Sequence, residues 1–125
     1  MGVINYRELI VWQKSMDLVE ETYKLVKFLP KEELYALSDQ MRRAAVSIPS
    51  NIAEGQSRNT TKEFVRFLSI ANGSNSELAT QLLISVRLNY LTETQIEKAM
   101  NLSDEVRRML KSLIEKLGDK ELCRI

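Results

Sequence analysis

The stretch LYALSDQMRRAAVSIPSNIAEG, residues 34–55, decides how the chain folds. Its apolar side chains recur at spacings of three and four residues, the period of one face of an α-helix. They are Leu34, Leu37, Met41, Ala44, Ala45, Ile48 and Ile52. We therefore predict a helix over residues 34–54 that ends at Gly55, because glycine is favoured directly after the last helical turn.

Pro49 lies inside this predicted helix. An interior proline removes one backbone hydrogen bond, and its ring crowds the preceding turn. The residues alone therefore predict either a bend near residues 45–49 or a break into two short helices.

Three further segments have the same helical period, over residues 6–29, 61–89 and 93–117. In the first of them, Pro30 disfavours helix at the residue before it and supplies the end. The predicted core stripe of that segment is Leu9, Trp12, Met16, Val19, Tyr23 and Val26, widened by Leu18, Leu25 and Leu29.

The middle of the third segment, NGSNS at residues 72–76, has poor helix propensity. The apolar stripe nevertheless stays in phase on both sides of it, so we predict one continuous helix. The stripe is Phe64, Phe67, Leu68, Ala71, Leu78, Leu82 and Val86.

The starts of the last two predicted helices resemble capping boxes, with Thr60 paired to Glu63 and Thr92 paired to Gln95. We expect the fourth helix to end at Gly118 and to be followed by a loose tail. Its predicted core stripe is Ile96, Ala99, Val106, Leu110, Leu113 and Leu117.

Short connections make consecutive helices antiparallel, so we predict an all-α, up-down-up-down four-helix bundle in one domain, residues 1–125. The chain has 4 glycines and 2 prolines, too few for the many turns of an all-β fold.

The sequence contains no histidine, which excludes Ser-His-Asp and Cys-His catalysis and any imidazole-ligated metal site. The single cysteine, Cys123, rules out an internal disulfide and fits a reducing compartment. No apolar run approaches the length of a membrane span, and no secretory signal is visible. We expect a cytoplasmic, non-enzymatic protein without cofactor, metal or small-molecule substrate.

Polar side chains gather on the second and third predicted helices in a pattern that differs from an ordinary solvated face, which usually carries lysine and glutamate. Such residues suit contacts between helices or between subunits, or a ligand site. The candidates are Arg43, Ser47, Ser50, Asn51, Glu54, Asn72, Ser74, Asn75 and Glu77. We also predict that Glu77 pairs with Arg42 or Arg43.

Basic residues offer a second candidate site, for RNA or DNA. They are Arg42, Arg43, Arg58, Lys62 and Arg66, with a separate group at Arg107, Arg108 and Lys111. Acidic residues are interleaved with both groups, and 18 basic against 17 acidic residues leave a net charge of +1. Taken alone, these groups are better explained by surface solvation than by a phosphate-binding groove.

Three stretches of the chain strongly resemble a family of small four-helix bundles that includes proteins encoded in intervening sequences of 23S ribosomal RNA genes. They are LIVWQKSMDLVEETY, residues 34–55 and EFVRFLSIANGSNSELATQLL. The likeness extends from about Tyr6 to Leu117. Tyr35-Ala36-Leu37 departs from it, since the family usually has Tyr-Gly-Leu there.

The resemblance implies a left-handed antiparallel bundle, a helix that continues through Pro49, and a ring-shaped homo-oligomer, a pentamer. The ring would present a surface to a nucleic-acid or protein partner. The family is also similar to the accessory variability determinant of diversity-generating retroelements, a basic ring that binds nucleic acid and a reverse transcriptase. A near-neutral charge separates this chain from that relative, so direct RNA or DNA binding is the alternative function.

Overall fold

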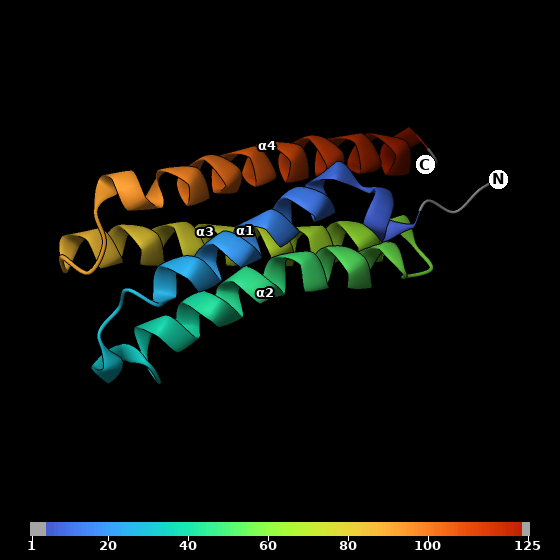
Figure 1. Cartoon of the computed structure of the whole chain (residues 1–125). Helices are drawn as coiled ribbons and strands as arrows, with labels where there is room; N and C mark the ends of the chain where they lie inside the picture. Colours follow the sequence, from blue (N-terminus) through green and yellow to red (C-terminus); the bar gives the residue numbers. More distant parts are fainter. Residues whose placement is uncertain (1–4, 124–125) are drawn as a thin grey trace.

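The computed structural model describes residues 5–123, with side chains through residue 118. Its four helices are α1 (Ile10–Val26), α2 (Leu37–Gln56), α3 (Thr61–Arg87) and α4 (Glu93–Cys123), with short 3-10 turns at Tyr6–Glu8 and Lys31–Glu33. They run alternately up and down and form the predicted antiparallel bundle (Figure 1). Both α1 and α3 pack against α2 and α4, so α2 and α4 lie on opposite corners of the bundle.

The core face of α1 differs in part from the predicted one. Met16 and Tyr23, on the predicted stripe, are 40% and 42% exposed. Of the predicted residues, Leu18, Leu25, Val26 and Leu29 are buried. Val11, Ser15 and Thr22 are buried as well, although the prediction left them out.

Hydroxyl groups explain this error. Ser15 Oγ donates to Trp12 O at 2.7 Å and Thr22 Oγ1 donates to Leu18 O at 2.8 Å. Because each hydroxyl is satisfied by its own helix, both residues can be buried although a hydropathy pattern counts them as polar. Helix α1 therefore has two apolar faces, and only one of them lies in the core.

Helix α1 is also shorter than the predicted segment at both ends. Leu9 has an extended backbone, and the helix begins only at Ile10. At the other end, Phe28 N donates to Leu25 O at 3.0 Å and closes a turn after Val26.

Helix α2 is continuous through Pro49, so a break at this residue is wrong. It begins at Leu37, three residues after the predicted start, and passes through Gly55 to Gln56, two residues beyond the predicted last helical residue, Glu54. Gly55 has a different role, because a Cβ atom there would lie 2.7 Å from Phe67 Cβ. Only a residue without a side chain lets α2 and α3 approach this closely.

Helix α3 is continuous through residues 72–76, as predicted. The first capping box is confirmed in part, since Thr60 Oγ1 accepts from Glu63 N at 3.1 Å. The second is confirmed in full, since Thr92 N donates to Gln95 Oε1 at 2.9 Å and Gln95 N donates to Thr92 Oγ1 at 3.1 Å. Asn89 follows α3 in the left-handed conformation, with φ 63°. Its N–H donates to Val86 O at 2.9 Å, which is one bond of a Schellman ending.

Helix α4 continues through Gly118 to Cys123, so the predicted end at Gly118 and the loose tail directly after it are wrong. A glycine ends a helix when it adopts a positive φ, and no glycine among residues 5–123 does so. The predicted core stripes of α2, α3 and α4 are confirmed except at Leu34, which precedes α2 and is 44% exposed; Ile48, Leu78 and Leu110 are fully buried.

Two glycine substitutions test the close contact between α2 and α3. We expect Gly55→Ala to destabilise the protein by about 1–3 kcal/mol, because the added methyl group must displace Phe67. Gly73→Ala is the matched control, since a Cβ atom there meets nothing within 4 Å and removing a helical glycine gains about 0.5–1 kcal/mol. Urea unfolding followed by far-UV circular dichroism, at one protein concentration, measures both. A Gly55→Ala variant as stable as Gly73→Ala would contradict the close approach.

Candidate interaction surface

Exposed large apolar side chains are unevenly distributed around the bundle. They lie on α1, α2, α3 and the connections between helices, whereas α4 carries none up to residue 118. The set is Ile10, Met16, Tyr23, Phe28, Leu34, Tyr35, Val46, Ile70, Leu83, Ile84 and Leu88. The outer face of α4 is therefore the least apolar up to residue 118, while Met109 and Leu113 on its α1 side line a hollow of about 520 Å³ with Leu9 and Ile10.

A shallow groove between α1 and α2 collects several of these side chains. One half, of about 260 Å³, is largely apolar and is lined by Tyr6, Trp12, Met16, Val19, Val46, Pro49, Ser50 and Ala53. The other half, of about 420 Å³, is lined by Tyr23, Asp39, Arg42, Arg43, Val46 and Ser47. Val46 belongs to both, so the two hollows form one feature, which we call the α1–α2 groove, with an apolar half and a polar half.

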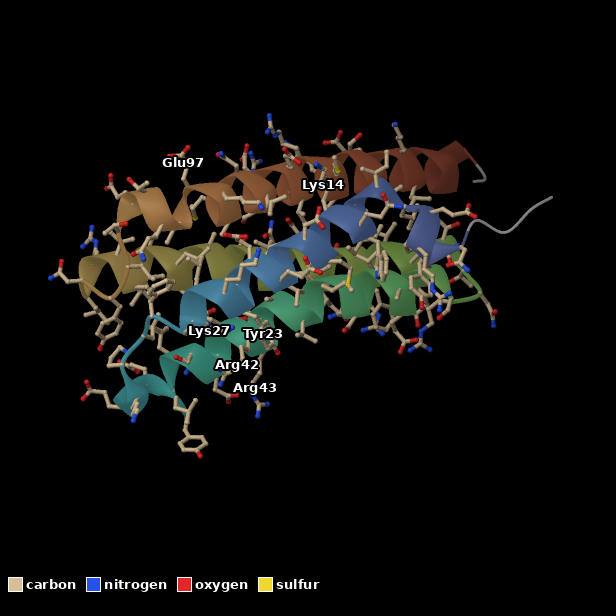
Figure 2. The ribbon with its side chains drawn as sticks, in the orientation of Figure 1. Lys14, Tyr23, Lys27, Arg42, Arg43 and Glu97 are labelled. Carbon is tan, nitrogen blue, oxygen red and sulfur yellow. The ribbon has the colours of Figure 1, made fainter. Side chains whose placement is uncertain are left out.

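The apolar half is built from the second apolar face of α1. Tyr6 and Trp12 pack edge to face there, with ring centroids 5.3 Å apart. Figure 2 shows Tyr23, Arg42 and Arg43 together near the start of α2, at the polar half. The apolar stripe of the sequence placed Trp12 and Tyr23 in the core, and so did not indicate the groove.

Polar residues on the other side of α2 join it to α3 within the chain. Ser47 Oγ and Ser74 Oγ are 2.8 Å apart. Asn51 Nδ2 donates to Ser47 O at 2.8 Å and to Ser47 Oγ at 2.9 Å. Ser47 and Ser74 therefore join the two helices, and Asn51 bonds Ser47 on its own helix, while Ser50 and Glu54 remain exposed.

Asn75 lies inside the bundle, where it contacts α4. It is only 2% exposed, and its Nδ2 donates to Ser103 O at 2.9 Å while Ser103 Oγ donates to Asn75 Oδ1 at 2.8 Å. Asn72 is half-buried, and its Oδ1 lacks a hydrogen-bond partner among the described residues. The sequence pattern did not single out Ser103, although it falls between Ala99 and Val106 in the α4 stripe.

The predicted ion pair between Glu77 and Arg42 or Arg43 is absent within the part of the chain that the structure describes. Both arginines turn to Asp39 on their own helix, Arg43 at 2.8 Å and Arg42 at 4.0 Å. Carboxylates three and four residues away on a helix are within easy reach, which favours these pairs over a contact with α3. Arg43 stays 80% exposed, and Glu77 is exposed as well.

The basic candidates do not form one surface. Arg42 and Arg43 lie in the first half of α2, roughly 24 Å along the helix from Arg58. At the turn between α2 and α3, Arg58 and Arg66 stack on the Phe67 ring, with guanidinium carbons 4.8 and 4.7 Å from its centroid. Stacking of this kind holds both cations in place at the end of the bundle.

Each of these stacked arginines also has a carboxylate partner. Arg58 Nε lies 3.5 Å from Glu54 Oε2, and Arg66 Nε donates to Glu63 Oε2 at 2.9 Å. The hydrogen bond from Arg66 lowers the pKa of the Glu63 carboxyl below its usual value. Lys62 is exposed and forms no ion pair among residues 5–118.

The outer face of α4 is charged in both signs. Arg107 Nη2 donates to Asp104 Oδ1 at 2.7 Å, and Arg108 Nη2 lies 2.9 Å from Asp104 Oδ2. The hydrogen bond from Arg107 lowers the pKa of the Asp104 carboxyl. Paired charges of this kind are typical of a solvated helix face.

Neither a metal site nor a membrane span occurs among the described residues. No three side chains of the metal-binding type come together in them. None of the helices within residues 5–123 has both the length and the apolar character needed to cross a membrane.

Comparison with known proteins identifies a family and a similar solved structure. A family model described as 23S rRNA-intervening sequence protein matches residues 7–112. The chain is also similar to a solved structure from Bacteroides thetaiotaomicron, of a protein of unknown function from the S23 ribosomal protein family. The TM-score is 0.78 and the sequence identity is 30%, and the match covers 84% of this chain and 98% of the other chain. No curated protein matches the chain.

The buried pair of Asn75 and Ser103 gives a test of the polar contacts. We expect Asn75→Ala to cost about 1–3 kcal/mol, because it leaves Ser103 without its buried partner. Ser76→Ala, at an exposed position next to it, should change stability by less than about 0.5 kcal/mol. Urea unfolding of Asn75→Ala, Ser103→Ala and the double variant measures the coupling between the two residues. Fully additive losses would show that the two side chains do not stabilise each other.

Proposed function

The chain belongs to the 23S rRNA-intervening sequence protein family, and on that premise we propose that it is a non-enzymatic assembly protein. Its copies form a ring-shaped homo-oligomer, a pentamer, that presents a surface to a nucleic-acid or protein partner. The observation that carries this proposal is the second apolar face of α1, which lines an open groove and leaves Met16 40% exposed and Trp12 and Val19 only half-buried.

Removal of this groove from water supplies the free energy for assembly. Met16 and Val46 are each 40% exposed, and Trp12 and Val19 beside them are half-buried. Burying apolar surface gains about 25 cal/mol for each Å² removed from water. An apolar groove bordered by polar residues such as Ser50 and Arg43 has the composition of a protein–protein contact.

The charged outer face of α4 supports an orientation in which α4 faces solvent in the ring. A ring needs a heterologous contact, in which one patch of each copy meets a different patch of the next. The α1–α2 groove provides one of these patches, and the opposite corner of the bundle, at α4, stays free for water.

A charge placed in the groove tests this proposal. We expect Val46→Glu to shift the protein from a multiple of its 14.4 kDa chain mass toward monomer, because the carboxylate would have to lose its water on assembly. Asn101→Glu adds the same charge on exposed α4 and should leave the mass unchanged. Sedimentation equilibrium at micromolar concentration measures both variants and the unmodified chain. A monomeric unmodified chain would overturn the proposal.

Direct binding of RNA or DNA is the second candidate function. It is favoured by the turn between α2 and α3, where Arg58 and Arg66 are both held on the Phe67 ring and Lys62 stands nearby. A ring would repeat this cluster once for each copy along one rim. Repetition raises the overall affinity of individually weak contacts.

The salt dependence of RNA binding tests this second function. We expect an RNA hairpin to bind at about 50 mM salt, with an affinity that falls linearly on a log–log plot as salt rises. Lys62→Ala should flatten the slope by about one for each copy that contacts the RNA, because each copy then neutralises one phosphate fewer. Lys98→Ala, at an exposed position on α4 outside both basic groups, is the control and should leave the slope unchanged. Fluorescence anisotropy measures both, and no binding at low salt would exclude the function.

A further inference from the structure

The connection between α1 and α2 holds an aromatic side chain out in solvent. Tyr35 is 91% exposed, more than any other large apolar residue among those described, and Leu34 beside it is 44% exposed. Tyrosine rings are favoured anchors of protein interfaces because they bury a large area and lose little conformational entropy. An exposed tyrosine in a firmly held loop therefore suggests a contact with another molecule.

The loop around Tyr35 is held by three hydrogen bonds from other parts of the chain. The Glu33 carboxylate accepts from Tyr90 Oη at 2.8 Å and from Leu37 N at 3.3 Å. Arg42 Nη2 donates to Leu34 O at 3.2 Å. The bond to Glu33 raises the pKa of Tyr90, which therefore keeps its proton. Because these bonds fix the loop before any contact forms, binding through Tyr35 loses little further entropy.

We propose that Tyr35 of one copy docks into the polar half of the α1–α2 groove of the next copy. This inference rests on the proposed ring and names the two patches that meet in it. The Tyr35 side chain of one copy inserts into the hollow between Tyr23, Val46 and Arg43 of the next copy.

The chemistry of the polar half matches a tyrosine side chain. Val46 and Tyr23, 40% and 42% exposed, offer apolar and aromatic contact to the ring. The Arg43 guanidinium is paired with Asp39 through its Nε at 2.8 Å, and its side chain is 80% exposed, which leaves its outer face accessible to an aromatic ring. The Asp39 carboxylate at the same hollow can accept a further hydrogen bond from the phenol hydroxyl. A hollow of about 420 Å³ has room for one such ring.

The position of the groove also favours a neighbouring copy as the source of the ring. Tyr35 does not fill its own groove, since it is 91% exposed. Tyr35 comes two residues before the start of α2, and Asp39, Arg42 and Arg43 of the polar half lie in the first two turns of that helix, so the loop and the hollow are at the same end of the bundle.

Substitution of the ring tests the contact. We expect Tyr35→Ala to weaken self-association by about 30-fold, the loss typical of an interface anchor. Tyr35→Phe keeps the ring and should lose much less. Leu88→Ala removes another exposed apolar side chain, near the end of α3, and serves as the control. Sedimentation equilibrium gives the association constants, and equal constants for Tyr35→Ala and the unmodified chain would overturn the docking.

Cross-linking tests which surfaces meet. The natural cysteine is first removed by Cys123→Ser. In this background, Ala36→Cys places one thiol beside Tyr35 and Val46→Cys places a second thiol in the α1–α2 groove, while Tyr35 itself is kept. A short bismaleimide should produce a ladder of covalent multimers larger than dimers on a denaturing gel. Ala36→Cys combined with Asn101→Cys on α4 should give no ladder.

The outcomes separate the docking from the ring. Dimers from Ala36→Cys alone would show that two loops meet symmetrically, and would overturn the docking. An assembled chain without a ladder would overturn the docking and leave the ring intact. A monomeric unmodified chain would overturn the ring itself.

Discussion

The close contact between α2 and α3 is the constraint on which the rest of the structure depends. It is made by small residues, with Gly55 against Phe67 and Ser47 against Ser74. A Cβ atom at Gly55 would already lie 2.7 Å from Phe67, so the two helices have no room for a larger residue there. Because α2 is held tightly against α3 on one side, its other side, with Val46 and Pro49, is left to form the groove with α1.

The function that we propose follows from the way α1 meets this pair. Helix α1 has two apolar faces, and the bundle uses the one in which Ser15 and Thr22 satisfy their own hydroxyl groups. The bulkier face, with Trp12 and Met16, is left at the surface. A helix that leaves Met16 exposed and Trp12 half-buried while it buries Ser15 and Thr22 is better explained by assembly than by monomer stability.

Charge has a secondary role in this molecule. The arginines that a sequence pattern offers for nucleic acid are held by Asp39, Glu54 and Glu63 on the same or the adjacent helix. Exposed pairs of this kind add little stability, and they reduce the positive potential available to a phosphate backbone. Contact through shape and apolar area therefore ranks ahead of electrostatic binding for this chain.

The sequence by itself determined the helical class, the antiparallel order, the core faces of α2, α3 and α4 and the capping boxes at Thr60 and Thr92, because these depend on local spacing. It also marked Ser47, Asn51 and Ser74 as unusual. The tertiary structure alone decided which face of α1 is buried, that Asn75 meets Ser103, and that α2 continues past Gly55. Two apolar stripes on one helix are equivalent until a neighbour packs against one of them, and the choice depends on the fit of side chains from distant parts of the chain.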